Sequence, residues 1–137
     1  MRMLLAFPAL AVVIVFYNIL GASGSMIEPE SLFFDTVLPS GTEIFFKVGD
    51  LFVLGGLLAL FFEILKAARL ASAIILDHIL STAVFIVALL EFLLVSFCGT
   101  VTFFLLTVMA LIDAVAGFSV SIMSARRDYS VHRDGGL

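Results

Sequence analysis

Residues 69–127 constrain the fold of this chain more than any other part of it. Two apolar stretches run through this segment, and residues 96–100 join them. A hydrocarbon layer about 30 Å thick needs about 20 apolar residues of α-helix, because each residue advances the helix by about 1.5 Å. Each stretch has that length. The segment is therefore predicted to form a transmembrane helical hairpin.

The composition extends this prediction to the whole chain. Hydrophobic residues make up 63% of the 137 residues, and charged residues make up 13%, whereas soluble domains carry about 25% charged residues. We therefore expect residues 1–137 to form a single membrane domain without a soluble catalytic module, and we expect no enzyme activity. The chain has no basic stripe, so a nucleic-acid partner is not expected.

Four apolar stretches predict an all-α fold, a four-helix transmembrane bundle with spans at about residues 3–20, 44–65, 70–97 and 100–124. The first stretch follows Arg2 and precedes small residues at positions 21–23, so a cleaved signal peptide is the alternative interpretation. Its apolar run is longer than the core of an ordinary signal peptide, which favours a span.

The connections between the predicted spans are short, apart from an outer loop at residues 21–43. Within this loop, residues 31–38 are expected to lie along the membrane surface as a short helix that ends before Pro39. Thr42 and Glu43 are expected to begin the helix of the second span. Residues 125–137 are expected to be a poorly ordered tail.

Basic residues indicate the orientation of the chain. Six of the seven lie at its start, after the second span or near its end: Arg2, Lys66, Arg69, Arg126, Arg127 and Arg133. Positively charged residues in short loops stay on the cytoplasmic side. Both termini are therefore expected on the cytoplasmic side of the membrane. The outer loop carries the acids Glu28, Glu30, Asp35 and Glu43.

Five ionisable residues in or near the spans form an intramembrane polar seam and are the candidate functional residues: Asp113, His78, Asp77, Glu63 and Glu91. Charged side chains cost about 2.5 to 3.5 kcal/mol at the bilayer centre, so they face other helices. Asp113 lies roughly 20 Å along its helix from Arg126, which makes it the deepest acid. We expect His78 to be its interhelical partner, with Asp77 or Glu63 toward the cytoplasm. The neutral alternatives for that partner are Asn18, Tyr17, Thr82 and Thr107.

Spacing along the helices predicts two ion pairs at the membrane boundaries. Glu63 precedes Lys66 by three residues, so their side chains meet on a helix at the inner boundary. Lys47 and Asp50 repeat this spacing at the outer boundary. Glu91 is expected at the outer interface.

Small residues recur at helical spacing in the second and fourth spans. Such stripes let helices approach closely, and they predict these helix-packing positions: Gly55, Gly56, Ala59, Ala114, Gly117 and Ser121. Short connections make the second span a neighbour of the third, and the third a neighbour of the fourth. The chain lacks the His or Cys spacing of a metal site, and neither a metal nor another cofactor is expected. The lone Cys98 is expected to be a buried thiol, with an intermolecular disulfide as the alternative.

Two functional hypotheses follow from these features. The first is a small accessory, assembly or scaffold subunit that docks to a larger membrane complex or to copies of itself. The second is a proton- or cation-coupled transport oligomer that uses Asp113, His78 and Asp77, because such residues serve as relays inside membranes. The bilayer and a protein partner are expected in both hypotheses.

One set of residues in the second half of the chain carries a family resemblance. The set comprises Asp77-His78, Leu80-Ser81, Phe85-Ile86, Glu91-Phe92, Phe103-Phe104-Leu105-Leu106, Met109, Asp113, Ala116-Gly117-Phe118 and Ala125-Arg126-Arg127-Asp128. With these residues, the region of spans two to four resembles small four-span inner-membrane proteins of proteobacteria. The resemblance implies the compartment and the four helices, and it implies no catalytic or binding residue.

Overall fold

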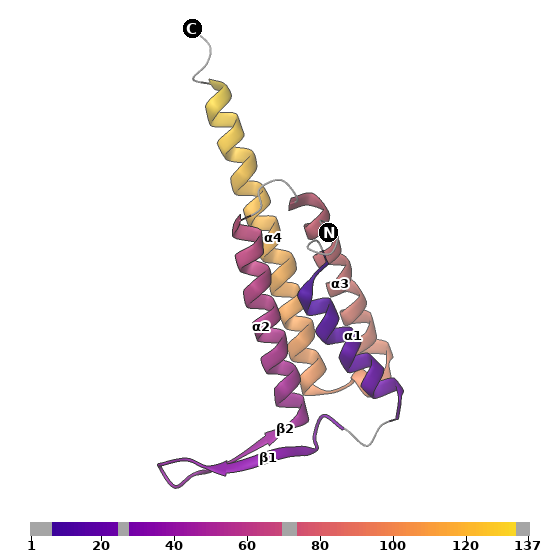
Figure 1. The fold of residues 1–137 in the computed structure, drawn as a ribbon. Coiled ribbons are helices and arrows are strands. Elements are labelled where there is room, and N and C mark those ends of the chain that lie inside the picture. Colours follow the sequence, from indigo (N-terminus) through magenta and orange to yellow (C-terminus); the bar gives the residue numbers. More distant parts are fainter. Residues whose placement is uncertain (1–6, 25–27, 70–73, 134–137) are drawn as a thin grey trace.

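Helices dominate the computed structural model of this chain, which describes residues 7–24, 28–69 and 74–133 (Figure 1). In chain order the elements are α1 (Ala9–Ala22), β1 (Leu32–Val37), β2 (Glu43–Lys47), α2 (Val48–Arg69), α3 (Ile74–Leu94), the short 3-10 helix η2 (Ser96–Cys98) and α4 (Val101–Arg133). The mostly helical prediction is confirmed, but the expectation of an all-α chain is wrong because residues 32–47 contain two strands.

Helix α4 lies at the centre of the helix packing. It contacts α3 and α2 extensively and α1 more weakly, while α1 packs mainly on α2 (Figure 1). Between Val101 and Ser119, 44% of the residues are buried, compared with 28% between Val48 and Lys66 of α2. Within α4, Phe103 and Leu106 are fully buried. The core therefore forms around α4.

The neighbours of α2 differ from the expected arrangement. Over the described residues, α2 packs against α1 and α4 rather than α3, so the expectation that the second and third spans are neighbours is wrong. Gly56 of α2 leaves space that Leu106 and Met109 of α4 fill. This complementary fit between side chains, rather than the short connection after α2, selects the neighbour of α2.

Several helix boundaries also differ from the sequence prediction. Helix α1 begins at Ala9, directly after Pro8. Proline is tolerated at a helix start because an N–H at this place would have no partner within the helix. Residues 3–6 of the first predicted span lie outside the described residues. Helix α3 ends at Leu94, and Val95 is extended. Helix α4 continues to Arg133, so the expectation that the chain leaves the helix at residue 125 is wrong.

A β-hairpin occupies the outer loop, where a short surface helix was expected, so that expectation is wrong. The strands are antiparallel, and Phe34 lies opposite Phe46, with Thr36 opposite Ile44. At the turn, Leu38 N–H donates to Thr42 O at 2.9 Å, and Gly41 has a φ of 84° that favours glycine. Aromatic and β-branched residues favour strands. Such residues occur both before and after Pro39, in Leu32–Val37 and in Glu43–Lys47.

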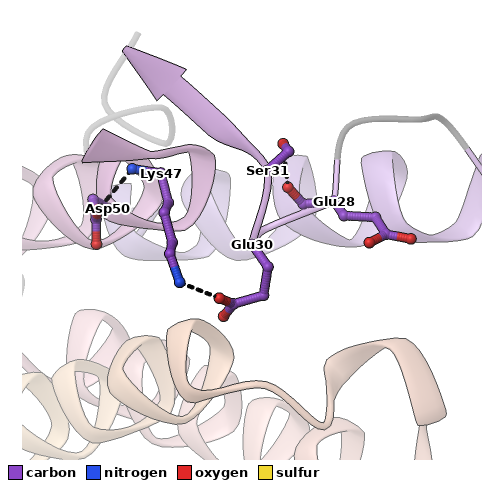
Figure 2. Close-up of polar contacts among 5 residues, drawn as sticks. All are labelled: Glu28, Glu30, Ser31, Lys47 and Asp50. Atoms are coloured by element: carbon purple, nitrogen blue, oxygen red, sulfur yellow. Dashed lines mark hydrogen bonds and ion pairs between the residues drawn. The ribbon is translucent and has the colours of Figure 1, made fainter. Parts of the chain in front are cut away.

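The hairpin is fixed to the start of α2. The Val48 N–H donates to Ser31 O at 3.0 Å, and the Gly49 N–H donates to Pro29 O at 2.8 Å. The Asp50 carboxylate accepts from the Lys47 N–H at 2.8 Å (Figure 2). These bonds satisfy N–H groups that a helix start leaves without partners. The expectation that Thr42 and Glu43 begin this helix is therefore wrong.

The outer faces of the helices are apolar. Large exposed hydrophobic side chains follow all four helices, among them Phe16, Phe62, Leu93 and Val115. Within the described residues, Val48–Lys66 and Val101–Ser119 are long and apolar enough to cross a membrane, with mean hydropathies of 2.1 and 2.2, while Ala9–Ala22 and His78–Leu94 are shorter apolar helices. Exposed apolar surface of this extent marks a membrane or protein contact.

Candidate functional site

Glu63 joins the end of α2 to the start of α1. One carboxylate oxygen lies 2.9 Å from Lys66 Nζ, which is the ion pair that the sequence spacing predicts. The other oxygen accepts a hydrogen bond from the Ala9 N–H at 2.5 Å. The first N–H groups of a helix carry partial positive charge, which favours a carboxylate at this place. The contact with α1 spans 54 residues of sequence, so helical spacing alone does not reveal it.

Asp113 pairs with a serine rather than with the expected histidine. Ser81 Oγ donates to Asp113 Oδ2 at 2.7 Å in a buried contact between α3 and α4. His78 lies one turn earlier on α3, and neither of its ring nitrogens has a hydrogen-bond partner within the described chain. The expected hydrogen-bonded pair of Asp113 and His78 is therefore wrong. Depth along two helices does not determine which side chains face each other across them.

His78 packs closely against α4. Its ring contacts Phe118 edge to face, with the ring centroids 3.8 Å apart. Its Nδ1 occupies the space that a Cβ of residue 117 would need, so the glycine at this position permits the contact. His78 and the Ser81–Asp113 pair are thus successive contacts along one helix interface.

Glu91 belongs to a third cluster near the C-terminal ends of α1 and α3. Its carboxylate accepts from Asn18 Nδ2 of α1 at 2.8 Å, and Asn18 Oδ1 accepts a weak hydrogen bond from Cys98 Sγ at 3.4 Å. Beside this cluster, the hydroxyl oxygens of Tyr17 and Thr100 lie 2.7 Å apart. The sequence offered Asn18 and Tyr17 only as alternative partners of Asp113, and it did not single out Thr100, because neutral polar residues in apolar stretches are weak signals.

Cys98 is buried in η2 and forms no disulfide within the described chain. Burial raises the pKa of its thiol to about 11, so little of the reactive thiolate exists near neutral pH. This finding favours the buried thiol over the intermolecular disulfide.

Most of the small residues predicted at helix contacts lie at such contacts. Gly56 faces Leu106 and Met109 of α4, and Ala59 and Ala114 are buried. Gly55 differs, because nothing in the described chain lies within 4 Å of the position that its Cβ would take. It lines an apolar groove of about 470 Å³ between α1 and α2. The side chains of Asp77 and Ser121 lie outside the described part of the chain.

The hairpin carries an exposed ion pair of its own. Lys47 Nζ lies 2.5 Å from Glu30 Oε2, and the two side chains are 48% and 65% exposed (Figure 2). The hydrogen bond to Glu30 is the main cause that raises the pKa of Lys47 above its ordinary value. The expected ion pair of Lys47 with Asp50 is wrong, because Asp50 bonds to the backbone N–H of Lys47 instead.

These contacts connect helices in pairs. Glu63 connects α2 with α1, Asp113 connects α4 with α3, and Glu91 connects α3 with α1. No group of three or more His, Cys, Asp or Glu residues that could hold a metal ion occurs within the described residues. The three acids thus each bond across a contact between two helices. Comparison with known proteins finds no match to this chain among family models, curated proteins or solved structures.

Proposed function

We propose that this protein is a four-span integral membrane protein of the bacterial inner membrane with both termini in the cytoplasm. In that membrane it serves as a small accessory or scaffold subunit of a larger complex. The observation that carries the proposal is the division of the molecule into an apolar exterior and an interior whose acids bond to neighbouring helices. The proposal also agrees with the resemblance to small four-span proteins of proteobacteria.

The distribution of charge supports the proposed orientation. Helix α2 ends at Arg69 and α4 ends at Arg133, and both ends lie away from the hairpin (Figure 1). The hairpin and its approach carry Glu28, Glu30, Asp35 and Glu43. Basic residues stay on the cytoplasmic side, so the hairpin lies outside. Helices α2 and α3 are about 33 and 31 Å long at the usual rise, which suits a hydrocarbon layer of about 30 Å.

The pairing of the acids supports a scaffold role. Hydrogen bonds between membrane helices contribute only about 0.6 kcal/mol each on average, so Ser81–Asp113 and Asn18–Glu91 select a helix arrangement more than they stabilise it. A proton relay needs neighbouring ionisable groups along a path, whereas Glu63, Asp113 and Glu91 form their bonds across three different helix pairs. A subunit with a fixed shape is what a larger complex requires of a scaffold.

His78 supports a second candidate function, a proton- or cation-coupled oligomer that uses Asp113, His78 and Asp77. Buried polar atoms normally have hydrogen-bond partners, and both nitrogens of His78 lack one within the described chain. A proton or a cation at this interface could bind to these ring nitrogens of His78. Flux into liposomes that Asp113→Asn abolishes would support this candidate, and absence of flux across pH and cation gradients would contradict it.

Two experiments test the proposed function. Native mass spectrometry of the protein in gently prepared membranes is expected to show a larger protein partner in fixed stoichiometry. A homo-oligomer without another protein would contradict the accessory role and favour the second candidate.

Cysteine labelling tests the topology. Cys98 is buried, so it can stay in place while Ser40→Cys and Ser130→Cys are introduced separately. An impermeant maleimide is expected to label Ser40→Cys on intact spheroplasts and Ser130→Cys only after lysis. The wild-type chain is the control and should stay unlabelled in both conditions. Labelling of both variants on intact spheroplasts would contradict the topology.

A further inference from the structure

The hairpin extends away from the helices as a separate feature. Strand β2 ends at Lys47 and α2 begins at Val48, so no flexible linker lies between them. The hairpin projects sideways from the start of α2 (Figure 1). Its attachment through Ser31 O and Pro29 O to the first turn of α2 fixes its direction.

Both edges of the hairpin have backbone groups that point outward. The bond from Leu38 N–H to Thr42 O marks one hydrogen-bonded pair, and such pairs alternate along an antiparallel ladder. Thr36 and Phe34 therefore bond inward to β2, whereas Asp35 and Val37 of β1 direct their N–H and C=O groups outward. A two-stranded hairpin is marginally stable alone in water, and an open edge accepts a further strand.

Strand β1 is the more exposed of the two strands. Every residue of β1 is exposed, while Ile44 and Phe46 of β2 are half-buried. The outward position Val37 is 61% exposed. Because side chains alternate between the two faces of a strand, Asp35 and Val37 lie on the same face, and they present a negative and an apolar side chain in succession.

The charges on this segment limit what can dock there. The hairpin and its approach contain four carboxylates, at positions 28, 30, 35 and 43, and one lysine, Lys47, which pairs with Glu30. Self-pairing of β1 edges in the register centred on Asp35 would place two copies of this carboxylate opposite each other, and like charges across strands are destabilising. Phosphate head groups would meet the same repulsion. A positively charged, extended peptide segment is complementary to this edge.

We propose that the β1 edge docks an extended basic segment of a partner protein as a third strand. A lysine or arginine of that segment lies beside Asp35, and an apolar residue lies beside Val37. This inference rests on the proposed function, and it identifies the surface and the partner chemistry through which the subunit joins its complex.

The test uses the full-length chain in zwitterionic nanodiscs and two labelled peptides of alternating sequence. One peptide alternates lysine and valine, and the other alternates glutamate and valine. Fluorescence anisotropy is expected to show at least about tenfold tighter binding of the lysine peptide, since opposite charges across strands attract and like charges repel. Equal binding of the two peptides, or binding of neither, would overturn the proposal.

Proline variants locate the edge. Val37→Pro removes an outward N–H of β1 while it leaves the inward bonds of the hairpin in place, and it is expected to weaken binding of the lysine peptide about five- to tenfold, because the third strand loses one hydrogen-bond donor. The matched variant Phe45→Pro removes an outward N–H of β2 and should keep binding. Asp35→Asn is expected to weaken binding about two- to fivefold. Full binding by Val37→Pro would overturn the proposal.

A tryptophan reporter distinguishes peptide docking from contact with the bilayer. The chain has no tryptophan, so Val37→Trp gives a unique signal. A change in its emission when the lysine peptide is added supports the proposal, and quenching by brominated lipids without peptide would overturn it. Labelling of Ser40→Cys distinguishes failure of the docking proposal from failure of the proposed topology. A hairpin that is labelled but binds neither peptide overturns the docking alone. A hairpin that is not labelled on intact spheroplasts overturns the proposed topology.

Discussion

The interior of the helix packing and the hairpin each contain an ion pair between a glutamate and a lysine, in different surroundings. Glu63 and Lys66 are 8% and 18% exposed, whereas Glu30 and Lys47 are 65% and 48% exposed. Solvent-exposed pairs contribute about 0 to 1 kcal/mol, whereas removing one partner of a buried pair costs about 3 to 5 kcal/mol. Burial, rather than the distance between the charges, decides how strongly each pair affects folding.

The two regions also differ in how completely their polar groups are used. In the interior, Glu63 accepts from the Ala9 N–H as well as pairing with Lys66. At the hairpin edge, Asp35 and Val37 direct backbone groups outward. The interior therefore holds the fold together, and the hairpin offers groups for a further contact.

The largest effect is expected for Glu63→Leu. This change removes the acceptor of the Ala9 N–H and the anion beside Lys66, and it should lower the free energy of unfolding by about 3 to 5 kcal/mol. Reversible unfolding in mixed micelles of increasing SDS fraction measures it. Glu63→Gln keeps an acceptor for the Ala9 N–H and is expected to have a smaller effect. A leucine variant as stable as the wild type would contradict the conclusion that the buried Glu63–Lys66 pair affects folding more than the exposed Glu30–Lys47 pair does.

Two adjacent glycines test packing within one helix. Gly56→Ala places a Cβ 2.7 Å from Leu106 Cδ2 and 2.8 Å from Met109 Sδ. These distances are too short for non-bonded atoms, and such overpacking costs about 1 to 3 kcal/mol. Gly55→Ala meets open space and should be neutral or stabilising by up to about 1 kcal/mol through helix propensity. The same SDS titration compares the two variants. Equal effects at both positions would contradict the packing of α2 on α4.

The bond between Ser81 and Asp113 should have a smaller effect. A double-mutant cycle of Ser81→Ala and Asp113→Asn is expected to give a coupling energy of about 0.6 kcal/mol and no more than about 1.7 kcal/mol, the range for bonds between membrane helices. SDS unfolding of the two single variants and the double variant provides the cycle. A coupling indistinguishable from zero would mean that these side chains do not act as a pair in the membrane.

The smallest effect is expected at Lys47. The hydrogen bond to Glu30 raises the pKa of Lys47 above 10.5. A raised pKa means that folding favours the protonated amine, so its contribution is present below pH 10.5 and is lost as the pH rises through the folded-state pKa. NMR titration of the Lys47 side chain should show this pKa fall in Glu30→Gln. Unfolding midpoints of this variant should match the wild type near neutral pH, and a clear loss of stability would contradict the comparison.

Local spacing in the sequence predicted some features of the site and missed others. The Glu63–Lys66 pair was predictable because both residues lie on one helix turn. The Ser81–Asp113 pair was not, because the rotation of α3 about its axis decides whether Ser81 or His78 faces Asp113. The hairpin was missed because residues 44–47 continue an apolar stretch into α2, and their strand character depends on pairing with residues 32–37.

The sequence by itself determined that the chain is mostly helical, because long apolar stretches can satisfy their backbone groups within a helix. It also determined the separation of basic residues from the acidic loop. Only the tertiary structure decided that α4 lies between α2 and α3 and that residues 32–47 pair as strands. These outcomes depend on the fit of side chains such as Leu106 against Gly56 and on backbone bonds between separate segments. The spacing of apolar residues along one segment does not show which residues of another segment it will contact.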